Sequence, residues 1–259
     1  MEHWVAGDGT VGKAFAVLDR VASFGRPVRF GELLDGSPFP KATLYRLVQT
    51  LTGEGALHYD EERQTYSVGL RLVGLAHSAW AQSSLAPIAR PAVDALSLEC
   101  GETVHLAQLD GGQVLYVDKR NALKPIEMYS QAGKVGPAYC TGVGKAMLAF
   151  LPDEQMVSVV EKQAFYRFTS TTLANANALK AELTVIRSDG VAYDREEHEP
   201  GIICIAAPVL SRRGMPIGAL SITTSTQRHT LDDLEIFRQP LLSAATTIAD
   251  AAEAWQFPA

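Results

Sequence analysis

The sequence predicts an α+β protein built from two domains that a helix joins. The first 69 residues contain three helical patterns followed by two short β-prone runs. Residues 70–84 continue as an apolar helical stretch, and from residue 85 hairpin signals alternate with helical patterns. This alternation is typical of an antiparallel sheet with helices packed against it. A chain of 259 residues is also long for one compact domain.

The composition is that of a globular protein. Apolar residues make up 47% and charged residues 20% of the chain, which provides material for sizeable cores. No apolar run approaches the ~20 residues that span a bilayer, and MEHWVAGDGT at the N-terminus lacks the pattern of a secretory signal. Cys100, Cys140 and Cys204 are an odd number at wide spacing, so we expect reduced thiols and a cytoplasmic protein.

The charge of the chain does not favour a nucleic-acid binder. The net charge is −6, and the first 69 residues carry seven lysines and arginines against nine aspartates and glutamates. A DNA-binding surface in this part of the chain therefore has to place a few cations locally.

Three helices are expected in the first domain. The first spans residues 10–24, a short second helix spans residues 29–35, and a turn at 36–38 leads into the third, which ends at Gly53. One apolar face of the third helix follows the spacing i, i+3, i+4, i+7 and consists of Leu44, Leu47, Val48 and Leu51. Two short helices joined by a tight turn form the helix-turn-helix arrangement.

The outer face of the third helix suits DNA. It carries Tyr45, Arg46 and Gln49 among small side chains and has no carboxylate, so its groups can donate hydrogen bonds to base edges and phosphates. After it, residues 56–59 and 65–68 read as a hairpin whose loop contributes Arg63, which completes a winged helix-turn-helix. The alternatives are an ordinary amphipathic surface helix and a small domain that binds protein.

The linker helix, residues 70–82, is apolar on more than one side. Its apolar residues are Leu70, Leu72, Val73, Leu75, Ala76 and Trp80. Such a helix needs partners on two faces, and the same helix of a second subunit would pair two DNA-reading heads. The alternative is packing against the second domain of its own chain.

The second domain is expected to run from residue 85 to residue 259. Helices are predicted over residues 87–100, 141–151, 153–160 and 174–188, and a final long helix is capped by Thr230 and kinked by Pro240. Strands are predicted over residues 103–109, 113–118, 191–193, 201–209 and 217–223. The first two strands form a hairpin across Asp110-Gly111-Gly112.

Several ordered segments resemble the IclR family of bacterial transcriptional regulators. They are PKATLYRLVQTL in the reading head, and GETVHLAQLDGGQVLYVDKR, GKVGPAYCTGVGKAMLAFLP and YDREEHEPGIICIAAPV in the second domain. The resemblance covers nearly the whole chain. It implies a winged helix-turn-helix, a GAF/PAS-like effector domain, homodimers often paired into tetramers, and control of catabolic genes by a small organic acid. Pro38 and Ala42 depart from the family pattern, which usually has glycine and a phosphate-contacting serine there.

Two sets of site residues follow. For double-stranded operator DNA we expect contacts from Arg29, Lys41, Thr43, Tyr45, Arg46, Gln49 and Arg63. For the effector, the resemblance implies polar or backbone contacts at Gly142, Val143, Asp194, Cys204, Ser221 and Thr223, with Met128 and Ile202 as apolar walls. A repressor and an activator would use the same reading head.

The residues themselves also favour a ligand site near residue 142. Thr141-Gly142-Val143-Gly144 begins a helix, and helix-start N–H groups suit a carboxylate. The alternatives are that the glycines serve helix packing, that Cys204 is a buried core thiol, and that Asp194 belongs to a solvated charged turn. Asp194 beside an anion is expected to accept from a ligand hydroxyl or to close a hydrogen-bond network.

A cytosolic enzyme on the second domain is the remaining alternative. Cys204, His198 and Asp194 could form a nucleophile set, but sequence spacing cannot establish the contact such chemistry needs. The chain has no G-x-S-x-G, C-x-x-C or H-E-x-x-H motif. We therefore expect a regulator without a catalytic residue, metal or cofactor.

Overall fold

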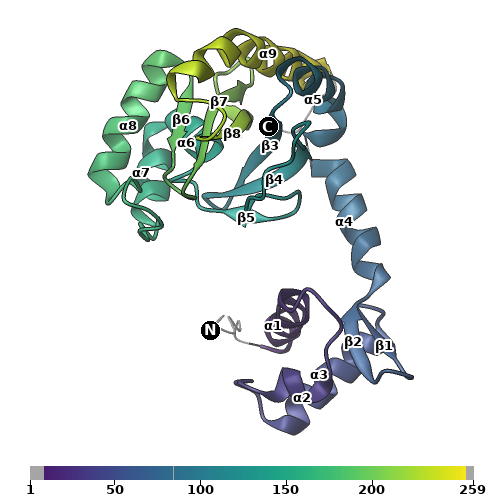
Figure 1. The fold of residues 1–259 in the computed structure, drawn as a ribbon. Helices are drawn as coiled ribbons and strands as arrows, with labels where there is room; N and C mark the ends of the chain where they lie inside the picture. Colours follow the sequence, from purple (N-terminus) through teal and green to yellow (C-terminus); the bar gives the residue numbers. More distant parts are fainter. Residues whose placement is uncertain (1–8, 84, 255–259) are drawn as a thin grey trace. The chain divides into compact units, whose positions relative to one another are not determined.

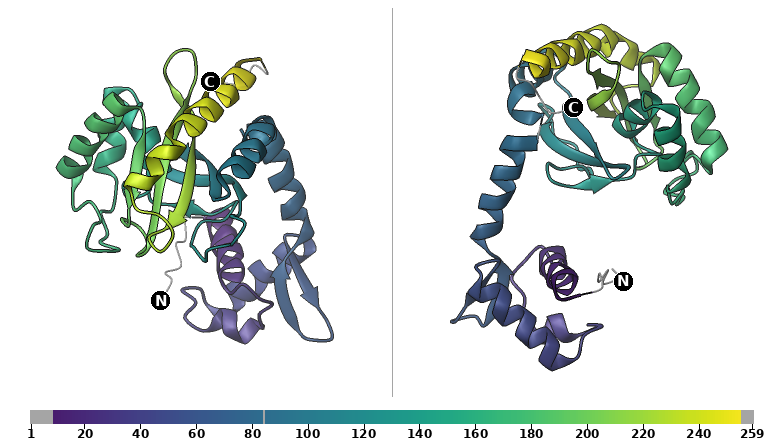
Figure 2. Two further views of the ribbon diagram at one scale, coloured as in Figure 1. Left: turned by 45° about the horizontal axis from the view of Figure 1, so that its top comes forward. Right: turned by 180° about the vertical axis from the view of Figure 1, so that it is seen from behind.

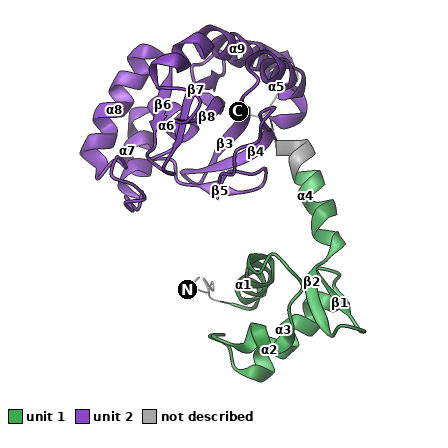
Figure 3. Ribbon diagram, in the orientation of Figure 1, with its two compact units in different colours: residues 1–82 green, residues 83–259 purple. Residues whose placement is uncertain are grey.

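The computed structural model describes residues 9–83 and 85–254, without the side chains of residues 80–83. The chain divides into two compact units, residues 1–82 and residues 83–259 (Figure 3). The division falls within the helix that was predicted as a linker.

The first unit contains the three helices and the hairpin that the sequence predicts. Its elements are α1 Thr10–Ser23, α2 Phe30–Leu34, α3 Lys41–Gly53, β1 Leu57–Asp60, β2 Thr65–Val68 and α4 Leu70–Ser83. The two strands pair antiparallel, with Leu57 opposite Val68 and Asp60 opposite Thr65. The four apolar residues of α3 that follow the helical spacing are all buried in the core of this unit. That burial fixes which face of α3 remains outside.

The second unit is built on one antiparallel sheet. Its helices are α5 Ala86–Cys100, α6 Gly142–Ala149, α7 Asp153–Glu161, α8 Ala176–Asp189, the 3-10 helix η1 Asp232–Phe237 and α9 Arg238–Ala254. Its strands are β3 Thr103–Asp110, β4 Gln113–Arg120, β5 Val135–Gly136, β6 Ala192–Arg195, β7 Ile202–Leu210 and β8 Pro216–Ser225. They lie in the order β5-β4-β3-β8-β7-β6.

Helices cover both faces of this sheet (Figures 1 and 2). α5 and α9 pack together on one face, where α9 lies over β7 and β8 and α5 over β3 and β4. On the opposite face α6 packs against the central strands, and α7 and α8 lie outside it. The start of α6 therefore lies directly on the middle of the sheet.

The C-terminal helix differs from the prediction. Thr230 exchanges hydrogen bonds with Asp233 just before η1, whose N-cap residue is Leu231, whereas the long helix begins only at Arg238. Pro240 lies in the first turn of α9, where its missing N–H removes no helical hydrogen bond, so the predicted kink was wrong. The two-residue strand β5 was not predicted.

Among the described residues, no helix combines the length and the apolar content that crossing a lipid bilayer requires.

Candidate functional site

Four neighbouring strands of the second unit carry polar residues in two rows. Asp194 of β6 pairs with Cys204 of β7, which pairs with Thr223 of β8. In the next row Ser221 of β8 pairs with His105 of β3. Alternate residues of a strand face the same side of a sheet, so the two rows share one face, the face that α6 covers.

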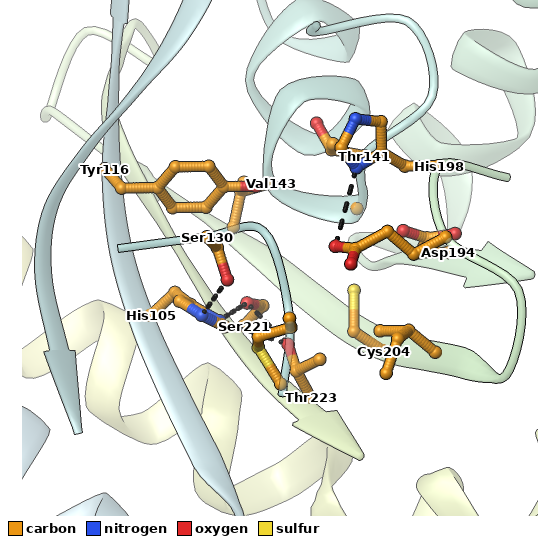
Figure 4. Close-up of a pocket in the computed structure, with 14 residues that line it drawn as sticks. His105, Tyr116, Ser130, Thr141, Val143, Asp194, His198, Cys204, Ser221 and Thr223 are labelled. Carbon is orange, nitrogen blue, oxygen red and sulfur yellow. Dashed lines mark hydrogen bonds and ion pairs between the residues drawn. The ribbon is translucent and has the colours of Figure 1, made fainter. Parts of the chain in front are cut away.

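A cavity lies between this face of the sheet and the start of α6 (Figure 4). Its lining includes all eight positions expected for the effector: Met128, Gly142, Val143, Asp194, Ile202, Cys204, Ser221 and Thr223. Six further residues line it that were not expected to: His105, Tyr116, Ser130, Thr141, His198 and Glu199. The sequence had singled out Thr141 only as part of the helix start and His198 only as part of a possible nucleophile set, and nothing in the local pattern indicated that the other four line a cavity.

His105 is the centre of a buried hydrogen-bond network (Figure 4). Its Nε2 lies 2.7 Å from the hydroxyl of Ser130, and its Nδ1 lies 3.3 Å and 3.2 Å from the hydroxyls of Ser221 and Thr223. Burial, with a contribution from Lys119, lowers the pKa of His105 to about 3. The imidazole is therefore neutral at physiological pH and supplies one donor and one acceptor to the hydroxyl groups around it.

The start of α6 opens into the cavity without a side-chain cap. Thr141 is the N-cap residue, but its hydroxyl donates to the carbonyl of Pro137 at 2.8 Å and makes no capping bond to the helix. Gly142 and Val143, the first two helical residues, line the cavity. N–H groups at a helix start carry a partial positive charge and suit an anion.

Gly142 and Gly144 also serve packing. A β carbon on Gly142 would lie 2.4 Å from the Sγ of Cys204, and one on Gly144 would lie 2.4 Å from the carbonyl oxygen of Ala138. Glycine is thus required at both positions for α6 to approach β7 and the preceding loop. The packing explanation and an anion site at the helix start are compatible, because packing uses the Cα and an anion would use the N–H.

Two carboxyl groups face the cavity, and their pKa values are shifted in opposite directions. Asp194 is buried and accepts the N–H of Glu197 at 2.8 Å, and burial raises its pKa to about 7. Burial also acts to raise the pKa of Glu199, but His198 and the N–H of Tyr129 lower it below its ordinary value. Asp194 therefore takes up a proton far more readily than Glu199. Asp194 is buried, so the alternative of a solvated charged turn does not apply to it.

A buried ion cluster lies behind the cavity. The ammonium of Lys145 is fully buried and contacts the carboxylates of Glu197 and Glu182, the latter at 3.1 Å. Arg195 joins Glu182 at 2.7 Å. The cluster connects α6 and α8 to the segment that carries Asp194, His198 and Glu199, and so fixes one wall of the cavity.

The chemistry of the cavity does not suit a cysteine nucleophile. Burial and the neighbouring Asp194 raise the pKa of the Cys204 thiol, whereas an activated cysteine needs a lowered one. Within residues 9–83 and 85–254, no group of three His, Cys, Asp or Glu side chains is arranged to hold a metal ion.

In the first unit, the outer face of α3 carries Tyr45, Arg46 and Gln49, all exposed. The ring of Tyr45 meets that of Phe30 edge-on at 5.7 Å, and the amide of Gln49 reaches the Tyr66 hydroxyl at 3.4 Å. These contacts hold the side chains of Tyr45 and Gln49 on the outer face of α3. Lys41 is exposed at the helix start and Thr43 is half-buried.

Arg29 and Arg63 do not lie on α3 but line a hollow of the same unit. Arg29 precedes α2, and Arg63 is in the wing loop, where its side chain is 79% exposed and 4.0 Å from Asp60. The two arginines line one hollow, the wing hollow, whose other lining residues are Phe30, Gly31, Tyr59, Gln64, Tyr66 and the acidic Glu62. The structure therefore separates the seven expected DNA-contacting residues into the face of α3 and a wing hollow.

These features define a class of protein. A winged helix-turn-helix unit with an open polar helix face, on the same chain as an α+β unit with a polar cavity, is the architecture of a transcriptional regulator. Two family domains match the chain. The domain described as bacterial transcriptional regulator IclR C-terminal matches residues 77–250, and the IclR helix-turn-helix domain matches residues 10–61. The chain belongs to the IclR family of bacterial transcriptional regulators. It is a DNA-binding regulator, not an enzyme, as the sequence predicted.

Individual relatives agree. The HTH-type transcriptional regulator KdgR of Dickeya chrysanthemi is 32% identical over 238 residues, which cover 92% of this chain and 78% of that protein. XynR of Escherichia coli is 30% identical over 244 residues, covering 93% and 96%. The crystal structure of IclR of Thermotoga maritima superposes with a TM-score of 0.77 at 28% identity, over 93% of this chain and 97% of that one.

Proposed function

We propose that a small organic acid binds in the cavity of the second unit and thereby changes the affinity of the protein for an operator. In this proposal the regulator is a cytoplasmic homodimer, able to pair into a tetramer, and it controls catabolic genes. The relative named acetate operon repressor in Salmonella typhimurium, 28% identical to this chain, supports a link to the metabolism of small acids.

The observation that carries the proposal is the uncapped start of α6 at the wall of a polar cavity. The N–H groups of Gly142 and Val143 would receive the carboxylate, and the hydroxyls of Ser221 and Thr223 would donate hydrogen bonds to it beside them. Met128 and Ile202 would cover its carbon skeleton. Three or four charge-assisted hydrogen bonds at ~1.5–3 kcal/mol each suffice for micromolar affinity after the costs of association.

The same proposal assigns DNA contacts to two surfaces of the first unit. Tyr45, Arg46 and Gln49 on α3 would read base edges in the major groove, with Lys41 and Thr43 near its backbone. Arg29 and Arg63 in the wing hollow would contact phosphates. Because cations make the phosphate contacts, affinity should fall as salt rises, with a slope set by the number of those contacts.

Dimerisation is assigned to α4. Leu70, Val73 and Leu75 are 85%, 62% and 57% exposed, and apolar side chains at this density on one helix need cover. The Trp80 side chain, which the sequence placed in the same apolar set, lies outside the described residues. A ligand alters DNA binding only if it favours one of two arrangements of the paired reading heads.

A thermal-shift screen of carboxylic acids on the full chain tests the proposal, because a ligand that binds the folded state raises its melting temperature. We expect at least one acid to raise the melting temperature and to alter binding of a duplex recovered by selection from random DNA. Acids that leave both unchanged across hydroxy, keto, sugar, dicarboxylic and aromatic classes would contradict it.

A further inference from the structure

The charges around the cavity disfavour an acidic ligand. Of the described residues that line it, none is a lysine or arginine, whereas Asp194 and Glu199 both present carboxyl groups. The nearby ammonium of Lys145 already contacts two carboxylates, Glu182 and Glu197. An anion entering this space meets like charge, and like charges in a shared buried site bring a proton to one of them.

Asp194 lies beside the start of α6, where a protonated carboxyl group could donate a hydrogen bond to a bound anion. It is 7% exposed, and its backbone N lies 3.6 Å from the position of a β carbon on Gly142, so it adjoins the start of α6. One carboxyl oxygen, Oδ1, is occupied by the N–H of Glu197. The second oxygen can carry a proton toward the cavity.

We propose that Asp194 binds the effector as a neutral carboxylic acid, donating a hydrogen bond to the ligand's carboxylate, so that binding takes up one proton. This inference rests on the proposed function and adds the way its anion is recognised and regulated. The proton comes from solvent and stays on Asp194, and no covalent bond of the ligand changes. The ligand's carboxylate then lies between the N–H groups of α6 and the Asp194 acid.

The groups around Asp194 favour this assignment. Those that face it are Lys145 from α6, Cys204 from β7, Tyr116 from β4, Cys140 before α6, and Glu197 and His198 from its own segment. Burial raises the pKa of both thiols and of Tyr116, so these three carry no charge at neutral pH. Burial already raises the pKa of Asp194 to about 7, and an adjacent anion raises it further.

Glu199 does not compete for the proton. The N–H of Tyr129 donates to its carboxylate at 3.0 Å and His198 lies 3.7 Å away, and both contacts favour the ionised form. The structure thus provides one carboxyl that can protonate and one that remains charged in the same cavity.

The consequence is a regulator whose effector affinity depends on pH. Below about pH 7 Asp194 is already protonated, so affinity for a fully ionised acid should vary little. Above that range each pH unit removes about nine-tenths of the protonated form, so affinity should fall about tenfold per unit. A rise in pH would release the effector at constant ligand concentration.

The test uses the full chain and the acid that gives the largest shift in a panel containing glycolate, D-gluconate, 2-oxoglutarate, succinate and benzoate. Isothermal titration is performed at pH 6, 7, 8 and 9, and at pH 8 in two buffers of different ionisation enthalpy, which counts the protons taken up. We expect uptake approaching one proton and a fall of about tenfold from pH 8 to pH 9.

Three variants separate Asp194 from its neighbours. Asp194→Asn keeps an acceptor for Glu197 and supplies a permanent donor, so proton uptake and the pH slope should vanish. Glu199→Gln and His198→Gln remove the other two titratable groups at this end of the cavity, and both should keep the slope. The carboxamide of the bound acid gives a test without any variant, since its affinity for the wild type should not fall with rising pH.

Each outcome has one meaning. An acid that binds the wild type with no pH slope overturns the inference and leaves the proposed function standing. A slope that persists in Asp194→Asn, or disappears in His198→Gln, assigns the proton elsewhere and also overturns it. The inference is also overturned if the carboxamide loses affinity with rising pH as the acid does. If no acid binds at any pH, the proposed function fails and the inference fails with it.

Discussion

Gly142 at the start of α6 and Cys204 in the middle of β7 are in direct contact, because a β carbon on Gly142 would come within 2.4 Å of the Cys204 Sγ. We therefore expect Gly142→Ala to destabilise the second unit by about 1–3 kcal/mol, the usual cost of overpacking a core. Urea unfolding of the full chain, followed by a probe in the second unit, measures the loss.

The matched control for Gly142→Ala is the double variant with Cys204→Ala, which removes the sulfur atom. Of the neighbours that remain, the β carbon of Ala206 lies 3.2 Å away and requires only a small adjustment, and the backbone N of Asp194 lies at 3.6 Å. The double variant should lose less stability than the sum of the two single variants. Strictly additive losses would show that the contact does not control the position of α6.

Arg46→Ala should weaken specific DNA binding. Arg46 is exposed on the outer face of α3, so if it makes a bidentate contact with guanine its loss costs ~1–3 kcal/mol and relaxes the preference at one base pair. Selection from random duplexes with both proteins, followed by anisotropy titration, measures the two effects. Arg71→Ala is the control, because Arg71 pairs with Glu54 at 2.7 Å and lies on α4. Equal losses in the two variants would point to charge alone.

Much of the first unit could be predicted from local spacing. The period of Leu44, Leu47, Val48 and Leu51 determines the buried face of α3, and therefore which polar side chains remain outside. The hairpin follows from two β-prone runs on either side of a short polar loop. Where the prediction failed, at Thr230 and Pro240, the short helix η1 directly precedes the long helix α9, and the break between them leaves no mark in the apolar pattern.

Local sequence indicated a ligand site only near Gly142, and the rest of the cavity could be predicted only by resemblance. Its walls include residues of β3, β4, β6, β7 and β8 and of the start of α6, and the pairing of β3 with β8 joins residues 116 positions apart, such as His105 and Ser221. No local pattern gives that pairing. Nor does any pattern show that Lys145 is fully buried against two glutamates, since an isolated lysine in an apolar helix reads as a surface residue.

Replacing Val73 and Leu75 by glutamate should dissociate the dimer that we propose. Both side chains are exposed on α4, so the change should leave the core of the first unit intact. Leu72 packs against that core, and Leu72→Glu should instead lower the stability of the unit. Sedimentation at micromolar concentration separates the two effects. A wild-type protein that sediments as a monomer would remove the basis of this assignment.

His105 should make the second unit sensitive to acid. Its folded pKa of about 3 lies below the ordinary value, so between those values the unfolded chain binds a proton that the folded chain does not. Stability is therefore present at neutral pH and is lost as pH falls, by about 2 kcal/mol between pH 7 and pH 5 from this residue. His105→Gln should flatten this part of the pH dependence in urea unfolding, whereas replacing the exposed His58 should not.

The most direct test of the proposed control is the response of DNA binding to the effector in a protein whose cavity hydroxyls have been removed. Ser221→Ala with Thr223→Val deletes two donors beside the start of α6, each worth ~1.5–3 kcal/mol to a bound anion, and leaves the first unit untouched. Anisotropy of a selected operator duplex is followed while the acid identified by thermal shift is added. We expect unchanged operator affinity without the acid. The acid concentration that gives half of the change in operator binding should be at least tenfold higher than for the wild type. A double variant that folds and responds at the wild-type acid concentration would show that the effector does not bind in this cavity.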